Sequence, residues 1–269
     1  MAEIIAVANQ KGGVAKTTTA HNIAVGLSMR GKKTLMVDMD SQASLTICAG
    51  LEPQDVADRS IVSVLTDENG KHQDIKECIH QIGVGEYITE NCYIVPSVID
   101  LADLEWKMFA RVSRELILKR AMESIKDDFD YIVIDCPPQL SILTINALSC
   151  ADGVIIPVKT DYLAYRGLRH LKDTISSIQE LTNPGLKIYG VVATIYEKRA
   201  KNDTAILMEI NRENNVISII PKKVMAGKGV YDGLAVVELA PNSDVAQAYM
   251  DIVDMIISGR YERRGGIEA

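Results

Sequence analysis

The stretch NQKGGVAKTTT, residues 9–19, follows the apolar run IIAVA and contains a glycine pair and two lysines. An apolar run, a glycine-rich turn and Lys-Thr-Thr at the start of a helical pattern predict a strand–loop–helix unit that holds phosphate. In such a unit the backbone N–H groups and the helix N-terminus supply partial positive charge. Lys16 would reach the β and γ phosphates of a nucleotide, and the Thr17 hydroxyl would contact Mg²⁺. The residues predicted to bind the nucleotide are Gly12, Gly13, Val14, Ala15, Lys16, Thr17 and Thr18.

Ala15 stands where a phosphate loop normally has its last glycine. If this position has a positive φ, its Cβ costs on the order of 1 kcal/mol. If φ is negative, alanine is harmless and favours the following helix. The sequence leaves both possibilities open. A plain glycine turn is the alternative interpretation of the whole stretch, but it leaves Lys-Thr-Thr at the helix start unexplained.

Along the rest of the chain, β-branched apolar runs alternate with helical patterns. Strands are predicted at residues 4–9, 34–38, 93–97, 131–135, 153–158, 188–194 and 216–220, and helices at 16–30, 101–126, 141–150, 162–182, 203–213 and 243–258. This alternation predicts an α/β fold, a doubly wound and mostly parallel sheet flanked by helices, with ligands at the carboxyl ends of the strands. We expect one domain over residues 1–260, a variable insertion at 66–91 and a flexible tail at 261–269.

The composition fits a globular chain: 269 residues, 47% of them hydrophobic. No apolar segment reaches the roughly 18 residues of a membrane span, and no signal peptide precedes the first strand, so a cytoplasmic protein is expected. The five cysteines form no CxxC pair and the four histidines are scattered, which argues against a disulfide framework or a zinc site.

The charge is unevenly distributed. The net charge is −7, which taken alone disfavours a polyanionic partner. Residues 198–228, however, contain seven Lys and Arg against three Asp and Glu, so this stretch is +4 and the remainder is −11. A local basic surface on an acidic protein is therefore possible.

Four motifs in order resemble those of the ParA/MinD ATPases. KGGVAKTT (11–18) is similar to the deviant Walker A motif KGGxxK[ST][ST] of that family, and VDMDSQASLT (37–46) is similar to its switch I motif DxDPQxxxT. DCPPQLSILTINAL (135–148) resembles its Walker B and switch II, and ADGVIIPVKTDYLAYRGL (151–168) resembles the strand and helix that follow. The similarity extends over residues 3–257 and implies a P-loop ATPase that uses ATP and Mg²⁺.

The resemblance implies roles for individual side chains. In relatives the lysine matching Lys11 crosses a nucleotide-sandwich dimer and touches the phosphates bound by the other subunit, much as an arginine finger does. Asp40 matches the aspartate that positions the attacking water, and Asp135 matches the Walker B aspartate, which acts in the second shell of magnesium. Asp38, at the end of its own strand, suits the water shell of the same ion. Lys11, Lys16 and Asp40 are thus the expected catalytic residues, and Thr17, Asp38 and Asp135 the expected magnesium-site residues.

Each of these residues also has a plainer interpretation. Lys11 could be a solvated lysine at a loop edge, and an aspartate after a strand is often a helix cap. Ser41 replaces the usual proline of the family, which makes switch I more flexible and leaves the timing of hydrolysis open. Cys136 is interpreted as a packing residue, because no activating base is near it in sequence. Pro221 could either stack on adenine or end its strand.

Features of the C-terminal helix and of the cysteines indicate which branch of the family this chain resembles. MinD-like proteins end in a basic amphipathic helix that binds lipid, whereas residues 244–260 carry three aspartates and an apolar stripe at 245, 249, 252, 253 and 256 that suits a core. Cysteines of a nitrogenase-iron-protein-like reductase are not seen. The short ParA/Soj branch remains. It implies an ATP-dependent homodimer on non-specific double-stranded DNA, a nucleoid association and a ParB-like centromere-binding partner that triggers hydrolysis, with no membrane partner.

The DNA-binding candidates are Arg199, Lys201, Lys222, Lys223 and Lys228, with Arg166 and Arg169 behind them. Two alternatives stay open. One is a MinD-like positioning ATPase for another cargo, and the other is a nucleotide-gated interaction module with negligible hydrolysis.

Overall fold

The computed structural model describes residues 1–66, 72–84, 87–223 and 233–262. Its centre is an eight-stranded sheet in the order β3-β4-β2-β5-β1-β6-β7-β8. The strands are β1 (Glu3–Val7), β2 (Thr34–Asp38), β3 (His80–Val84), β4 (Tyr87–Val95), β5 (Tyr131–Asp135), β6 (Gly153–Lys159), β7 (Lys187–Tyr196) and β8 (Val216–Pro221). Every neighbouring pair is parallel except β3 and β4, so the predicted doubly wound α/β fold is confirmed.

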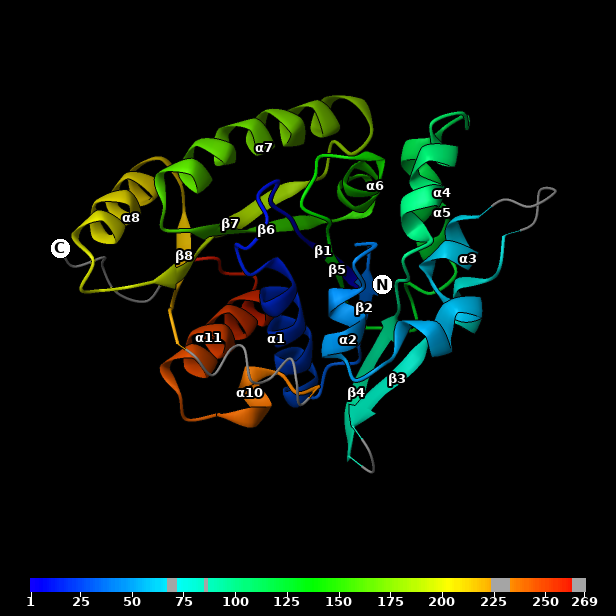
Figure 1. Ribbon diagram of the computed structural model, residues 1–269, viewed down its shortest axis with the longest axis horizontal. Helices are drawn as coiled ribbons and strands as arrows, with labels where there is room; N and C mark the ends of the chain where they lie inside the picture. The colour runs from blue at the N-terminus through cyan, green and yellow to red at the C-terminus, as the bar shows by residue number, and fades with distance from the viewer. Residues whose placement is uncertain (67–71, 85–86, 224–232, 263–269) are drawn as a thin grey trace.

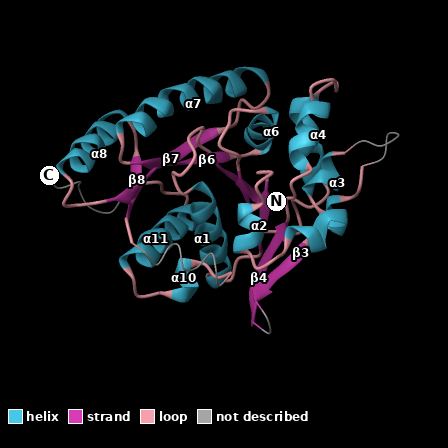
Figure 2. Ribbon diagram, in the orientation of Figure 1, coloured by secondary structure: helices cyan, strands magenta, loops and turns pink. Residues whose placement is uncertain are grey.

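Helices cover both faces of the sheet (Figures 1 and 2). One face carries α1 (Lys16–Met29), α2 (Ser44–Cys48), α10 (Val236–Leu239) and α11 (Asp244–Ser258). The other carries α3 (Ile61–Leu65), α4 (Leu101–Met108), α5 (Ile117–Met122), α6 (Ile142–Cys150), α7 (Tyr162–Leu181) and α8 (Lys201–Glu213). The continuous apolar strands follow from this arrangement: in β1, Ile4 and Ala6 enter one core and Ile5 and Val7 enter the other.

All seven predicted strands are present, but the sequence pattern missed one further strand, and one helix was predicted wrongly. β3 lies inside the expected insertion 66–91 and pairs antiparallel with β4. The single helix expected at 101–126 is divided into α4, a 3₁₀ turn at Arg114–Leu116 and α5. Ser113 has φ 51° at this break. The buried Asn146 side chain fixes the restart, donating to the Arg114 carbonyl at 2.8 Å and accepting from the Leu118 N–H at 3.1 Å.

The C-terminal helix is part of the core. The five apolar positions predicted to face inward on α11 are all buried: Val245, Tyr249, Ile252, Val253 and Ile256. After the helix, the Tyr261 ring stacks on Tyr189 with centroids 4.0 Å apart, and both hydroxyls donate to Glu3 Oε1. Tyr261 is therefore anchored, while residues 263–269 of the expected tail lie outside the described residues. Among the helices described, none is long and apolar enough to cross a membrane.

Gly26 sits in the middle of α1, although glycine costs a helix up to about 1 kcal/mol relative to alanine. The reason is the close approach of α11. A Cβ built on Gly26 would lie 2.7 Å from Val253 Cγ2 and 3.1 Å from Met250 Sδ. The glycine therefore sets the distance between the two helices that lie beneath the phosphate loop.

We predict that Gly26→Ala lowers the free energy of unfolding by about 1–3 kcal/mol, because overpacking outweighs the gain in helix propensity. Urea unfolding measures this change. The double variant Gly26→Ala/Val253→Ala should lose less stability than the sum of the single variants. Additive losses would mean that the two helices are not in the predicted contact.

Candidate functional site

The loop between β1 and α1 has the backbone that a phosphate site needs. Gly13 has φ 70° and Ala15 has φ 63°, so both residues are left-handed. The open question about Ala15 is thereby answered: its Cβ is held in a conformation that costs on the order of 1 kcal/mol. The fold maintains this strain at the mouth of the site, where strained residues tend to cluster.

The backbone N–H groups from Gly12 to Thr18 donate to no other group in the described part of the chain, whereas the next one, of Thr19, returns to the Ala15 carbonyl at 2.9 Å. Unpaired donors at the start of a helix form a nest that suits an anion. They open into a pocket of about 380 Å³ lined by Gly12, Gly13, Ala15, Lys16, Thr17, Thr18, Asp40, Ser44, Ile47, Cys48 and Pro138.

Neighbouring strands hold the loop in shape. The buried Asn9 donates to the Pro157 carbonyl of β6 at 2.7 Å and accepts from the Lys11 N–H at 3.0 Å. Thr194 of β7 donates to the Val14 carbonyl at 3.0 Å. Val14 is buried and acts as the anchor of the loop. Sequence reasoning missed Asn9 and Thr194 because their contacts join strands far apart in the chain.

Lys16 and Asp135 lie together at the floor of the loop. Lys16 is 7% exposed, its ammonium donates to the Lys11 carbonyl at 3.2 Å, and burial lowers its pKa although Asp135 opposes this shift. Asp135 is fully buried and neither carboxylate oxygen receives a hydrogen bond of normal geometry. Burial, and then the neighbouring Asp38, raise its pKa well above its usual value. The nearby Thr17 hydroxyl and Lys16 act in the opposite direction.

A buried carboxylate without a hydrogen-bond donor is unfavourable unless something compensates its charge. Asp135 beside Thr17 therefore fits a Mg²⁺ ion and its water shell, as predicted from the strand end. No group of three or more His, Cys, Asp or Glu side chains in the described residues forms a metal cage of its own. This pattern suits Mg²⁺, which retains several waters and uses one or two carboxylates together with phosphate oxygens.

Both carboxylate oxygens of Asp38 accept hydrogen bonds from other residues of the protein. Its Oδ2 accepts from the Thr46 N–H at 2.9 Å and from the Thr46 hydroxyl at 2.8 Å, and its Oδ1 accepts from the Asp40 N–H at 3.1 Å. The Thr46 hydroxyl in turn accepts from the Ser97 N–H at 2.8 Å. Burial raises the pKa of Asp38 to about 6 although these hydrogen bonds oppose it. Asp38 therefore braces switch I, and its magnesium role stays a prediction.

Asp40 lies at the wall of the phosphate pocket, half-buried. Its Oδ1 accepts from the Gln42 N–H at 3.0 Å, which leaves its other oxygen available to a water molecule. The structure thus brings together Lys16, Thr17, Asp40 and Asp135 in one site.

Lys11 lies at the rim and points away from the pocket. Its ammonium is 2.7 Å from Asp161 Oδ1, and Lys159 is 3.4 Å from the other oxygen of the same carboxylate. Asp161 also caps α7 by accepting from the Ala164 N–H at 2.8 Å. Sequence reasoning missed this acidic partner, although an aspartate before a helical pattern signals an N-cap.

The predicted DNA-binding residues divide into two groups. Lys222 is paired with Glu197, and Lys223 Nζ is 2.7 Å from Asp244 Oδ2. Their charges are therefore locally compensated.

Arg199 and Lys201 are exposed around the start of α8 and have no acidic partner in the described ranges. Lys228 lies outside the described residues. Pro221 ends β8 in register with Tyr196 and is not among the residues that line the phosphate pocket, so its contact with adenine stays a prediction.

All five cysteines are buried. Burial raises the pKa of Cys48 and Cys78 to about 11 and that of Cys92 and Cys150 to about 12, and raises that of Cys136 as well. A thiolate is the reactive form of cysteine. These side chains are therefore packing residues, as predicted for Cys136, and not nucleophiles.

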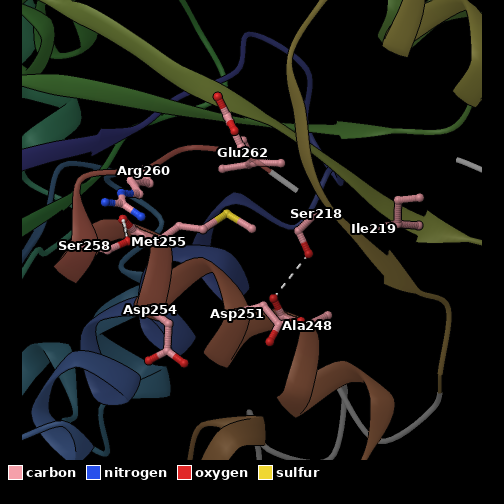
Figure 3. Close-up of a pocket in the computed structure, with 10 residues that line it drawn as sticks. Ser218, Ile219, Ala248, Asp251, Asp254, Met255, Ser258, Arg260 and Glu262 are labelled. Carbon is pink, nitrogen blue, oxygen red and sulfur yellow. Dashed lines mark hydrogen bonds between the residues drawn. The ribbon is translucent and has the colours of Figure 1, made fainter. Parts of the chain in front are cut away.

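Figure 3 shows a different pocket, of about 440 Å³, between β8 and α11. Ser218 in its wall donates to the Ala248 carbonyl at 3.2 Å, and Asp254 is held by Arg30 at 2.9 Å. It has no lining residue in common with the phosphate pocket. Its wall includes Asp251, Asp254 and Glu262 against one cation, Arg260, and this acidic excess disfavours a polyphosphate.

The sequence and fold of this chain are similar to those of known nucleotide-binding proteins. A family model described as an AAA domain matches residues 2–188. The sporulation initiation inhibitor protein Soj of Bacillus subtilis is 37% identical over 255 residues, covering 94% of this chain and 97% of the relative. The chromosome partitioning protein ParA of Myxococcus xanthus is 36% identical, covering 77% and 70%. The chain belongs to the ParA/MinD family.

A solved structure agrees with this assignment. A Mycobacterium smegmatis protein described as cobyrinic acid a,c-diamide synthase, crystallised with an ATP analogue and magnesium, superposes with a TM-score of 0.83 at 32% identity. It covers 99% of this chain and 100% of its own. The eight-stranded, mostly parallel sheet is thus the P-loop fold of the ParA/MinD family.

We predict that Ala15→Gly raises the free energy of unfolding by on the order of 1 kcal/mol, because it removes the Cβ from a left-handed residue. Urea unfolding without nucleotide measures it. Ala20→Gly, the same change at a helical φ in α1, should instead destabilise the protein. A loss of stability in both variants would contradict the strain at Ala15.

We predict that Thr46→Val lowers the free energy of unfolding by about 1–3 kcal/mol at pH 8. The change removes a hydroxyl donor from the ionised, buried Asp38. Folding raises the pKa of Asp38, so its own contribution favours the folded state at low pH and is lost as pH rises through about 6. The deficit of Thr46→Val should therefore be smaller at pH 5, where this carboxyl is protonated. Thr46→Ser, which keeps the hydroxyl, is the control. An equal deficit at both pH values would contradict the role given to the hydroxyl.

Proposed function

We propose that this protein is an ATPase of DNA segregation. In this proposal ATP and Mg²⁺ bind the phosphate loop, two copies close around the nucleotides, and the dimer stays on duplex DNA until a partner stimulates hydrolysis. The observation that carries the proposal is a phosphate loop with two lysines, Lys16 inside the pocket and Lys11 at its rim. The names of the Soj and ParA relatives support the same assignment.

Within one copy, the N–H groups of residues 12–18 and the Lys16 ammonium would hold the β and γ phosphates. Bound Mg²⁺ would neutralise charge on the phosphate oxygens. Thr17 and Asp135 are the residues best placed to hold it, and the buried carboxylate of Asp135 gains a counter-charge. Asp40 would orient the attacking water from the pocket wall, which fits slow turnover in the absence of a partner.

Lys11 would act between copies. Phosphoryl transfer spreads negative charge over the transferred group, so a cation supplied by the second subunit stabilises the transition state. In a symmetric dimer each copy gives its lysine and receives one. Asp161 competes for this lysine in the isolated chain, because Lys11 must leave it to cross. Hydrolysis is thereby tied to dimerisation.

The dimer would associate with the nucleoid through non-specific contacts between its cations and DNA phosphates. A ParB-like centromere-binding protein would then trigger hydrolysis and release. The MinD-like alternative has less support, because the apolar stripe of α11 is buried in the core and is not free for lipid.

The first test measures duplex DNA retention with no nucleotide, ADP or ATP. Wild type should bind in an ATP-dependent manner, Lys16→Ala should lose that dependence, and Asp40→Ala should keep binding for longer because it holds ATP without hydrolysing it. Phosphate release measured in parallel distinguishes an ATPase from a nucleotide-gated module without turnover. Equal retention in every nucleotide state would contradict the proposal.

The second test concerns the Lys11–Asp161 ion pair. Asp161→Asn should favour the dimer with a non-hydrolysable ATP analogue, because asparagine still caps α7 but no longer holds Lys11 by charge. A partly exposed pair of this kind contributes on the order of 1 kcal/mol, so the gain is about fivefold for each subunit. Light scattering across a protein dilution series measures it, with Lys11→Ala as the monomeric control. A weaker dimer for Asp161→Asn would contradict the competition.

A further inference from the structure

The helices α7 and α8 lie side by side on one face of the sheet and carry cations that the phosphate loop does not use (Figure 1). They enclose a groove of about 660 Å³, whose wall includes Arg166, Arg169 and Lys172 of α7. We infer that the arginine side of this groove is the surface that contacts the backbone of duplex DNA. The inference rests on the proposed function and names the surface through which that function would reach its DNA.

The cations of α7 are uncompensated. Arg166 and Arg169 are exposed and form no ion pair within the described ranges. Among the described residues, Lys172 donates to the Glu213 backbone carbonyl at 3.5 Å and forms no ion pair, which leaves its charge unneutralised. Lys222 and Lys223, by contrast, each hold a carboxylate and present almost no net charge to an approaching phosphate. Non-specific DNA affinity depends on phosphates neutralised by free cations, so α7 is the better contact surface.

Two acidic side chains also line the groove, Asp173 and Glu213. Glu213 ends α8 and accepts a hydrogen bond from the Tyr165 hydroxyl, which raises the pKa of that tyrosine. Asp173 comes one turn after Arg169 on α7. Glu213 therefore lies against the first turn of α7 through Tyr165, and within the described ranges neither acid forms an ion pair with Arg166 or Arg169. The three cations of α7 in the groove wall, Arg166, Arg169 and Lys172, outnumber its two acids.

The spacing suits a phosphate backbone. Residues 166, 169 and 172 rise about 9 Å along the helix axis, at about 1.5 Å per residue. Along the axis of a duplex, that distance spans two to three nucleotides of one strand, at a rise of about 3.4 Å for each phosphate. A row of flexible cations at this spacing neutralises successive phosphates without reading bases.

A second pair of free cations flanks the same helices. Arg199 and Lys201 lie at the start of α8, and this end is fixed beside the start of α7 because Thr160 donates to Asp203 at 2.8 Å. The start of α8 therefore extends the basic surface of α7 and does not form a separate patch.

The nucleotide loop touches this surface directly. Gln10 donates to the Gly167 carbonyl at 2.9 Å, between the two arginines, and Lys11 is paired with the helix cap Asp161. A Cβ on Gly167 would lie 3.1 Å from Gln10 Nε2, so the glycine permits this approach. Gln10 and Lys11 thus connect the nucleotide loop to the first two turns of α7, and movement of Lys11 toward a second subunit would leave Asp161 paired with Lys159.

The test compares three double variants of the chain with wild type. Fluorescence anisotropy with a labelled duplex and ATP, at several salt concentrations, should show at least a tenfold weaker Kd for Arg166→Ala/Arg169→Ala. The slope of log affinity against log salt should fall by about two, at roughly 0.9 per phosphate contact. Lys222→Ala/Lys223→Ala, the matched control, should change the Kd less than threefold. Arg166→Lys/Arg169→Lys should retain binding, because charge alone is needed. Basal ATP turnover, dimer mass and thermal midpoint should stay unchanged in all three variants.

The outcomes separate the inference from the proposed function. If wild type binds DNA with ATP but the arginine variant binds equally well, or the lysine pair proves dominant, the inference is wrong and the proposed function stands. If wild type dimerises and hydrolyses ATP but binds no DNA at low salt, both fail. A further experiment measures binding of the same variants to vesicles of anionic phospholipid. Arginine-dependent binding to vesicles in place of DNA would also overturn the inference.

Discussion

The backbone N–H groups from Gly12 to Thr18 converge on one pocket without an acceptor from the described chain, and much of the surrounding structure serves to hold them there. Unpaired donors are costly wherever water is excluded, so such an arrangement persists only where the fold over-determines it. Here Asn9 and Thr194 fasten the loop to β6 and β7, and Ala15 is kept left-handed despite its Cβ. Phosphate oxygens are the acceptors that would complete this arrangement.

Charge at the site follows the same logic. Lys16, Asp38 and Asp135 are all buried, and each has its pKa shifted toward the neutral form by desolvation. Asp38 is satisfied by Thr46 and the Asp40 N–H, whereas Asp135 has no comparable donor. The site is therefore incomplete in charge and in hydrogen bonds, and a nucleotide with its metal supplies both. The strain and the unsatisfied groups of the free protein are the features that make binding favourable.

Sequence patterns predicted the sheet well because each parallel strand is buried on both faces and reads as a continuous apolar run. The positions of the phosphate loop, Asp40 and Asp135 could be predicted from the sequence, because glycines, lysines and aspartates at strand ends form short local patterns. β3 was not predicted because a short antiparallel edge strand lacks such a run. The break between α4 and α5 was not predicted because it depends on the distant Asn146. The partners of Lys11 and Lys223 were equally invisible, since Asp161 is 150 residues from the former and Asp244 is 21 from the latter. Pairwise contacts between elements are set by topology, which local pattern does not encode.

The central claim is that Lys11 completes the site of the other subunit. Mixing Lys11→Ala with Asp40→Ala tests it directly, because both variants keep Lys16 and the loop that binds ATP. In a mixed dimer the Lys11→Ala copy retains its own Asp40 and receives Lys11 from its neighbour. The account predicts that each variant alone is nearly inactive and that the mixture recovers hydrolysis at one of its two sites. A mixture as inactive as its components, or full turnover by Lys11→Ala alone, would contradict it.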